Sequence, residues 1–399
     1  MNKSCSIFFL LVVLLGSYIF GGYTWVNPIR LTWNTSPSSH PVTVEDSLNQ
    51  VHIVWSDKSG LKDLYYKRST NGGTNWGSLQ QITWTGLSDT LSPSLTVDSN
   101  NILHLVYEEY TMIDSELYYK KSTNGGQTWS APVRLTWNAG LSMEPSICVD
   151  STNNIYVVWE DDSPGDSEIY FKRSTNGGGT WSSLQRLTWN SRDSLNPKIK
   201  SSAGSTLHIV WHERLNSTNY EIYYKKSTNS GTTWTPPTRL TWTSNNARYP
   251  EIAIDPAGNI HVAWEYGDIG DKEIYYKQSL DNGNTWSTVS RLTWMGGESR
   301  DPTMAADVNG TIAIAWNDDN SGPYDIYYKE STDSGITWTP LDRLTWTSGS
   351  TWKSFLGSGQ SGALHLVYAD NSAGNSEIFH KKRLITIPLG SSSRNSIKQ

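Results

Sequence analysis

The sequence predicts an all-β fold, a seven-bladed β-propeller of four-stranded antiparallel blades. The first reason is a tetrapeptide, Arg-Leu-Thr-Trp or a near copy, that recurs every 51 to 53 residues. Its seven copies end at Trp33, Trp84, Trp137, Trp189, Trp242, Trp294 and Trp346. A fixed period of this size marks a stack of equivalent units. The second reason is composition, because aromatic and β-branched segments alternate with turns rich in Gly, Asn, Asp and Ser.

Each repeat contains four apolar segments, most clearly at 145–150, 155–159, 168–173 and 185–189. Turn residues separate them, so each repeat forms four short antiparallel strands, the blade of a propeller. The repeated tryptophans are expected to pack in the core. Replacement of Trp129 or Trp189 by alanine is therefore expected to cost about 3–5 kcal/mol of stability.

The ends of the chain predict how the ring closes. The first tetrapeptide, at 30–33, precedes any innermost strand, and the last repeat, ending at Lys381, lacks a fourth strand. Trp25 stands eight residues before Trp33, as Trp76 stands before Trp84. The N-terminal strand is thus expected to complete the last blade, which removes two open sheet edges. The propeller is predicted to span residues 23–383.

The segments outside the repeats predict export. Lys3 precedes an apolar run at 7–15 and then small residues, so residues 1–22 are expected to be a signal peptide or an N-terminal anchor. Residues 384–399 form a polar tail. Cys148 is expected to be a buried free thiol, because Cys5 lies in the leader. These features predict an extracellular or cell-surface protein, and a monomer is expected.

Composition and motifs also limit which ligands and cofactors the protein is expected to bind. The net charge of −6 offers no electrostatic basis for binding nucleic acid. The sequence shows no nucleotide-binding loop and no metal-ligand spacing, so neither a cofactor nor a metal is expected.

Six turns between the third and fourth strands share the pattern Ser-x-Asn/Asp-x-Gly-x-Thr/Asn-Trp. They lie at 69–76, 122–129, 174–181, 227–234, 279–286 and 331–338. The Asn or Asp side chain can bond the backbone of the turn, and glycine supplies a positive φ. This pattern resembles the Asp box, the BNR repeat of the sialidase superfamily, and the resemblance covers residues 25–381. It implies the fold more than an activity, because the Asp box is structural.

Sialidases of this superfamily have six blades, three arginines that hold a substrate carboxylate, and a tyrosine nucleophile. In this chain Arg248-Tyr249-Pro250 is similar to the arginine motif that opens their first blade, although here it opens the fifth innermost strand. The resemblance implies Arg248, Arg300 and either Arg192 or Arg214 as carboxylate ligands, with Tyr249 as a candidate nucleophile.

Variation between the repeats indicates where a ligand site lies, because innermost strands line the channel of a propeller. Three successive repeats place Arg248, Arg300 and Trp352 at one position near the start of that strand. The next position carries His40, Glu144, Asn196, Tyr249, Asp301 and Lys353. The predicted ligand-binding set is Arg248, Arg300, Trp352, Tyr249, Glu144 and Asp301, suited to a sugar or an anionic group. If these residues bind a ligand, Trp352 is expected to be partly exposed beside Arg300. The alternative is a structural role, in which Arg300 and Asp301 form a local pair and Trp352 fills a gap.

Other polar residues recur in every repeat, which favours structural roles. Carboxylates end the second strands and are expected to be solvated loop caps that hydrogen-bond adjacent loops, with a glycosidase pair or a Ca²⁺ site as alternatives. They are Asp57, Glu108, Glu109, Glu160, Asp161, Glu213, Glu265, Asp318 and Asp370. The arginine of the tetrapeptide is expected to pair with an acid that opens the third strand. The repeated histidines of the second strand are expected to be structural.

Taken together, the residues predict a module that binds a glycan or an extracellular protein through the channel mouth. Two alternatives stay open, an exo-sialidase-like glycoside hydrolase and a purely structural adhesion or surface-layer module.

Overall fold

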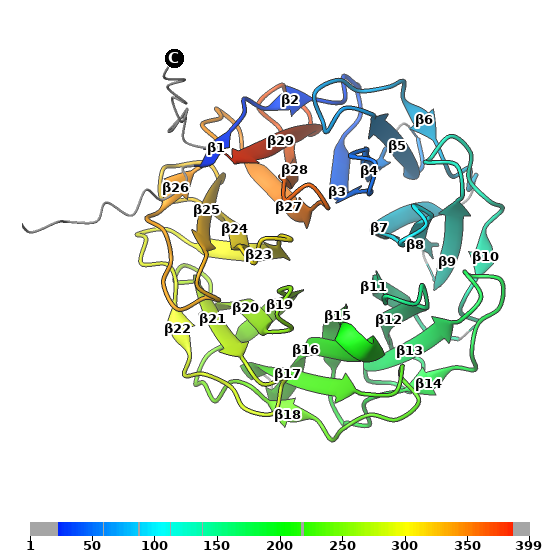
Figure 1. Ribbon diagram of the computed structural model, residues 1–399, viewed down its shortest axis with the longest axis vertical. Helices are drawn as coiled ribbons and strands as arrows, with labels where there is room; N and C mark the ends of the chain where they lie inside the picture. Colours follow the sequence, from blue (N-terminus) through cyan, green and yellow to red (C-terminus); the bar gives the residue numbers. More distant parts are fainter. Residues whose placement is uncertain are drawn as a thin grey trace, which may run out of the picture.

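The computed structural model describes residues 23–385 except positions 59, 87, 112, 138, 217 and 218. In this part of the chain seven antiparallel sheets surround a central channel (Figure 1). The predicted all-β, seven-bladed propeller is confirmed, and one short 3-10 turn, Ala203–Ser205, is the helical element of the described residues. The predicted leader, 1–22, and residues 386–399 of the predicted tail lie outside the described residues.

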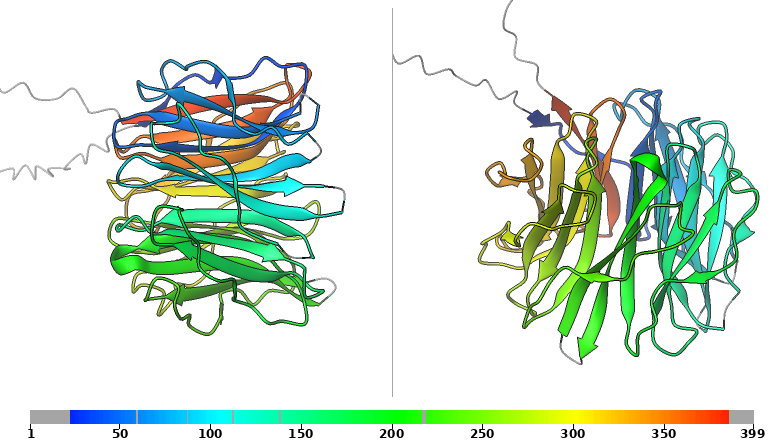
Figure 2. Two further views of the ribbon diagram at one scale, coloured as in Figure 1. Left: turned by 90° about the vertical axis from the view of Figure 1, so that its right-hand side faces the viewer. Right: turned by 60° about the horizontal axis from the view of Figure 1, so that its bottom comes forward.

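Each blade runs from an innermost strand at the channel to a short strand at the perimeter. The blades pack side by side around the channel (Figures 1 and 2). The innermost strands are β3 (Ser38–Glu45), β7 (Asp89–Val97), β11 (Ser142–Val149), β15 (Ser194–Ser202), β19 (Ala247–Ile254), β23 (Ser299–Ala306) and β27 (Thr351–Ser358). The second strands are β4 (Val51–Asp57), β8 (Leu103–Tyr110), β12 (Ile155–Asp161), β16 (Thr206–Asn216), β20 (Ile260–Tyr266), β24 (Ile312–Asp318) and β28 (Leu364–Asp370).

The third strands are β5 (Asp63–Ser69), β9 (Ser115–Ser122), β13 (Glu168–Ser174), β17 (Asn219–Ser227), β21 (Glu273–Ser279), β25 (Asp325–Ser331) and β29 (Glu377–Ile385). The outer strands are β2 (Ile29–Arg30), β6 (Gln80–Gln81), β10 (Val133–Arg134), β14 (Gln185–Arg186), β18 (Thr238–Arg239), β22 (Ser290–Arg291) and β26 (Asp342–Arg343). Blade 1 begins at β3 and blade 7 at β27.

The N-terminal strands close the ring as expected. Both β1 (Tyr23–Trp25) and β2 pair with β29, at residues 383–385 and 379–380 respectively. Trp25 packs edge to face on Tyr328 of blade 6, with ring centroids 5.2 Å apart. Arg383, which is buried, reaches Asp307 and Glu330 of the same blade at 3.2 and 2.9 Å. The closing strands therefore join blade 7 to blade 6 as well as completing a sheet.

The core of each blade is an aromatic stack between the second and third strands. A buried Trp or Tyr of the second strand lies against the first aromatic residue of the third, as Trp159 does against Tyr170 at 6.1 Å. Cys148 is also buried and has a free thiol, as predicted. The repeated second-strand histidines are buried too, and His52, for example, bonds the hydroxyl of Tyr66 at 2.7 Å. Their predicted structural role is confirmed.

The Asp-box turns join consecutive blades. Their tryptophan packs edge to face on a third-strand aromatic of the preceding blade, as Trp181 does on Tyr119 at 5.1 Å. In the same turn Ser174 Oγ accepts a hydrogen bond from Gly178 N at 3.0 Å. Gly178 has φ of 79°, and a Cβ there would lie 2.3 Å from the Tyr119 hydroxyl. Glycine is thus required both by the backbone and by the neighbouring blade.

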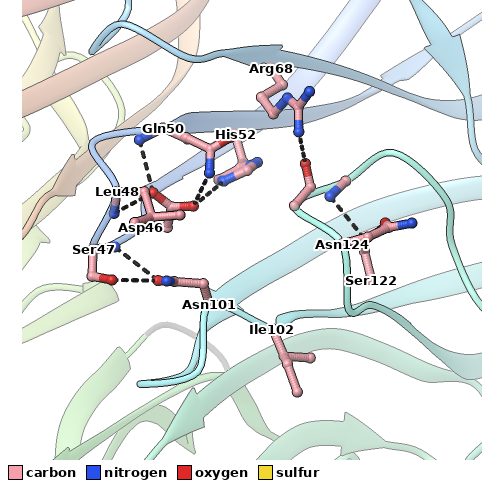
Figure 3. Close-up of polar contacts among 12 residues, drawn as sticks. Asp46, Ser47, Leu48, Gln50, His52, Arg68, Asn101, Ile102, Ser122 and Asn124 are labelled. Atoms are coloured by element: carbon pink, nitrogen blue, oxygen red, sulfur yellow. Dashed lines mark hydrogen bonds and ion pairs between the residues drawn. The ribbon is translucent and has the colours of Figure 1, made fainter.

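The turns after the innermost strands lie on the same face as the Asp boxes (Figure 3). Asp46 accepts hydrogen bonds from the backbone N–H groups of Leu48 and Gln50 at 2.9 and 2.8 Å. Ser47 bonds Asn101 of blade 2, and Arg68 donates to the carbonyl of Gly125 at 2.8 Å. This face is therefore fastened from blade to blade by side-chain contacts.

The outer strands end earlier than predicted, and this corrects the expectation for Trp189. In blade 3 the ladder stops at Arg186, because the Thr188 hydroxyl takes the place of a main-chain acceptor and bonds Ile169 N at 2.8 Å. The chain then leaves the sheet, and Trp189 is 67% exposed. The expected loss of 3–5 kcal/mol on its removal is wrong, because little of its surface is buried on folding. Trp129, by contrast, is half-buried against Tyr66.

The predicted charge pairs of the outer strand are present. Arg186 lies 2.6 Å from Glu168, and the same pair recurs in the other blades whose tetrapeptide begins with Arg. In blade 1 Gln81 donates to Asp63 at 2.9 Å instead. In the part of the chain that is described, no helix has the length and apolar character needed to cross a membrane.

The Asp-box turn of blade 3 offers a matched pair of glycine substitutions. Gly178→Ala should lower stability by about 3 kcal/mol or more, because the new Cβ overlaps the Tyr119 ring. Gly177→Ala has a similar positive φ of 64° but meets nothing within 4 Å, so it should cost only about 1 kcal/mol. Chemical unfolding of both variants measures the difference. Equal losses would show that the blade contact contributes nothing beyond backbone strain.

Candidate central binding cavity

One residue near the start of each innermost strand adopts a left-handed backbone conformation. The seven residues, with φ between 43° and 52°, are His40, Ser92, Glu144, Asn196, Tyr249, Asp301 and Lys353. None is glycine, and all but Lys353 precede a proline. The register with the second strand shifts at the same place in every blade. Such bulges redirect a side chain at an energetic cost, and they concentrate at functional sites.

The bulges surround a cavity of about 390 Å³ at the centre of the ring, and all seven residues line it. Their side chains carry an imidazole, a hydroxyl, two carboxylates, an amide, a phenol and an ammonium group. The backbone geometry thus recurs in all seven blades while the residue type differs at each position. A concave wall of mixed donors and acceptors is suited to one polar ligand.

Buried groups of the preceding blade hold several bulges in place. The N–H groups of Glu144, Asn196 and Asp301 donate to Glu108, Glu160 and Glu265 at 2.5, 2.6 and 3.3 Å. These three acids are buried. The prediction that the second-strand acids bond neighbouring segments is correct, but the expectation that these three are solvated is wrong, because they bond inward to the next blade.

Burial changes the protonation of this wall. It raises the pKa of Glu160 to about 8, assisted by the charges of Glu144 and Glu108. It raises the pKa of Glu108 to about 7, with Glu144 as a further cause. Burial together with Lys353 lowers the pKa of His40 to about 4. Burial therefore favours the neutral forms of both Glu160 and His40 at pH 7.

A second layer of the wall was missed from the sequence. Lys198 and Glu251, from blades 4 and 5, form an ion pair of 3.0 Å and both line the cavity. They occupy the position two residues after the left-handed residue, which reads Val42, Ser94, Ser146, Lys198, Glu251, Thr303 and Phe355. This column varies as much as the bulge column, and that variation was the available signal.

The structure separates the predicted ligand set into two groups. Glu144, Tyr249 and Asp301 line the cavity, and Tyr249 is 39% exposed there. The lining formed by the described residues includes neither Arg248, Arg300 nor Trp352 and has no arginine.

The side chains of the two arginines contact residues outside the cavity lining. Arg248 lies over the Tyr220 ring of blade 4 at 4.0 Å and donates to Asn246 at 3.2 Å. Arg300 pairs with Glu298 and lies over Tyr324 at 4.7 Å.

The remaining candidates also have local partners or positions outside the cavity. Arg214 pairs with Asp193 at 3.0 Å, and Arg192 is exposed. Trp352 is half-buried against the cluster between blades 7 and 1, which includes Leu31 and Trp55. Tyr249 N donates to His212 at 3.4 Å, and the two rings meet edge to face at 5.6 Å. Among the described residues no group of three or more His, Cys, Asp or Glu is placed to hold a metal ion.

The chain is a BNR-type β-propeller of the sialidase superfamily. Residues 153–395 match the model of the BNR repeat-like domain, more than half of the chain, so the protein belongs to that family. A sialidase of Bacteroides fragilis (strain YCH46) is 23% identical over 279 residues, 58% of this chain and 49% of that protein. The chain thus spans about half the length of this curated relative.

Solved structures share the fold at low identity. A Hadza microbial sialidase superposes with a TM-score of 0.53 at 15% identity, covering 75% of this chain and 66% of that one. An ulvan lyase, a polysaccharide lyase bound to -[GlcA(1-4)Rha3S]-, superposes with a TM-score of 0.61 at 11% identity, covering 86% and 93%. These similarities support the architecture alone.

The raised pKa of Glu160 predicts a pH-dependent stability. Folding raises this pKa from 4.5 to about 8, so the folded state binds the proton more tightly and loses stability as pH rises through that window. Glu160→Gln keeps an acceptor for Asn196 N and should melt like the wild type at pH 5 but higher at pH 9. The control is Asp166→Asn, which also removes one carboxylate but at an exposed position. If the melting temperatures of the wild type and Glu160→Gln differ by the same amount at every pH from 5 to 9, the raised pKa of Glu160 is contradicted.

Proposed function

We propose that this protein is an exported glycan-binding propeller whose ligand, an uncharged or zwitterionic sugar unit, enters the central cavity. The observation that carries the proposal is the ring of seven left-handed residues. It places seven different residue types around one cavity at a single position of the repeat. Strain retained in every blade is consistent with a binding role, because such conformations persist where they position functional groups.

The charge of the wall supports the ligand class. Lys198 is paired with Glu251, burial raises the pKa of Glu160 to about 8 and so favours its uncharged form, and the cavity lining among the described residues has no arginine. A sugar can use the donors and acceptors of Asn196 and Glu144, and Tyr249 offers a ring against its apolar face. Recognition of a free carboxylate favours bidentate arginine.

The sialidase-like alternative rests on the named relative and on the Arg248-Tyr249-Pro250 sequence. Arg248 and Arg300 contact different blades, at Tyr220 and Tyr324. Their present contacts therefore favour binding over the three-arginine arrangement that the resemblance implies. The proposal of export rests on the composition of residues 1–22. The mass of protein recovered from the culture medium tests it, since cleavage removes that segment.

Cavity variants test the binding proposal. A glycan array selects ligands, and calorimetry then measures affinity for Tyr249→Ala and Lys353→Ala. Each variant should weaken binding about tenfold, equivalent to about 1.4 kcal/mol. Lys382→Ala, beside Gly72 on the opposite face, is the matched control.

Two results would contradict the proposal. The first is unchanged affinity in both cavity variants. The second is turnover of a fluorogenic sialoside that Tyr249→Phe abolishes, which would favour the hydrolase alternative. Absence of any glycan ligand would favour the purely structural module.

A further inference from the structure

The seven tryptophans that end the tetrapeptides are all exposed, although every copy keeps the residue. The exposed fraction of each residue lies between 65% and 72%. The seven residues are Trp33, Trp84, Trp137, Trp189, Trp242, Trp294 and Trp346. Large apolar residues at equivalent exposed positions on every repeat are not explained by the core.

The other three residues of the tetrapeptide have structural roles. In blade 3 Leu187 is buried, and Thr188 Oγ1 accepts a hydrogen bond from Ile169 N at 2.8 Å. Arg186 pairs with Glu168 at 2.6 Å and donates to the carbonyl of Thr188 at 2.7 Å. The fold therefore accounts for Arg, Leu and Thr, and it leaves the tryptophan without a packing role of comparable extent.

Six of the seven indoles lie beside a cationic side chain. In six copies a lysine of the next blade or the arginine of the same tetrapeptide lies 5.2 to 5.9 Å from the ring centroid. The lysines donate to the leucine carbonyl of the tetrapeptide at 2.6 to 2.9 Å. These contacts restrain the ring from one side while most of its surface stays open to solvent.

The seven indoles share one face of the propeller. Each follows the end of an outer strand at the perimeter, where the chain turns inward to the next innermost strand (Figure 1). Because the bulges lie near the start of those innermost strands, the central cavity opens toward the same face. We name these seven residues the tryptophan ring.

The surroundings of the tryptophan ring indicate the kind of partner. Polar residues follow most of the indoles, for example Asn34, Asn190 and Thr243. The neighbouring arginines are about a third exposed, but each is paired with a buried acid, as Arg239 is with Glu221 at 2.8 Å. The ring thus consists of separate aromatic platforms with hydrogen-bonding neighbours and compensated charge. A membrane or a second protein chain favours a continuous apolar patch, whereas this arrangement fits separate hydroxyl-rich rings.

We propose that the tryptophan ring is a multivalent surface on which the pyranose rings of an uncharged polysaccharide stack. One platform binds a sugar weakly, but a polymer that contacts several platforms gains affinity through effective concentration. The compensated charges make this binding nearly independent of salt. This surface is separate from the central cavity, and the inference does not depend on the proposed function.

Oxidation of the indoles tests the surface on the unaltered protein. N-bromosuccinimide should modify the seven exposed tryptophans first, read by peptide mass spectrometry, while Trp159 and Trp211, which are buried, resist. Addition of a soluble polysaccharide from a panel of β-glucan, xylan, mannan and dextran should protect the tryptophan ring. Lack of protection by every member of the panel overturns the proposal.

Substitutions provide the second arm. Affinity electrophoresis in gels that contain the protective polysaccharide should show a loss of about twofold for Trp189→Ala. It should show a loss of more than about tenfold when Trp137, Trp189, Trp242 and Trp294 are all replaced by alanine. Both proteins should melt within a few degrees of the wild type. Retained binding by the fourfold variant overturns the proposal, and if that variant does not fold, the protection experiment decides.

Further controls separate this surface from the cavity and from other partners. Tyr249→Ala should leave polysaccharide protection of the tryptophan ring unchanged, and the fourfold variant should still bind the short glycans of the cavity. Loss of protection in Tyr249→Ala would assign the polymer to the cavity and overturn the proposal. Two other results would also overturn the proposal if polysaccharide gives no protection. One is protection of the tryptophan ring by phosphatidylcholine vesicles, and the other is protection that accompanies self-association of the protein, as measured by sedimentation.

Discussion

The structure depends on one contact, the edge-to-face packing of an Asp-box tryptophan on an aromatic ring of the preceding blade. Trp129 makes it with Tyr66, and Trp181 makes it with Tyr119, at centroid distances of 5.5 and 5.1 Å. Trp25 makes the equivalent contact on Tyr328, so the closing strand uses the same joint as the ordinary blades. Because a blade cannot bury both of its faces alone, these joints convert seven separate sheets into one cooperative ring.

A rigid ring allows local strain at the channel. Each left-handed residue costs of order 1–3 kcal/mol, so the conformation persists only where surrounding contacts determine it. Hydrogen bonds from the bulges to Glu108, Glu160 and Glu265 supply part of that determination. The side chain at a bulge lines the cavity and takes no part in the Asp-box contacts, so it can differ from blade to blade without loss of the fold. The same division is seen between architecture and binding surfaces in other repeat proteins.

Charge compensation characterises both surfaces of the cavity face. In the cavity Lys198 pairs with Glu251, and at the perimeter Arg239 pairs with Glu221. Among the described residues, neither surface presents the cluster of unpaired arginines that would select an anion. The similarity to the solved sialidase and polysaccharide lyase structures therefore concerns the fold.

The sequence alone determined the fold, because the period of the tetrapeptide, the Asp-box turns and the unpaired first strand are local patterns. It also located Glu144, Tyr249 and Asp301, because variation against a constant repeat is visible without coordinates. Only the tertiary structure decided that Arg248 and Arg300 do not line the cavity, since their partners are distant in the sequence. Arg248 contacts Tyr220 of the preceding blade, and Arg300 contacts Tyr324 of its own blade. The tertiary structure alone decided the exposure of the repeated tryptophans as well. A periodic pattern shows which residues are equivalent, but the threonine hydroxyl that ends the outer strand turns the next residue outward, and this depends on a neighbouring strand.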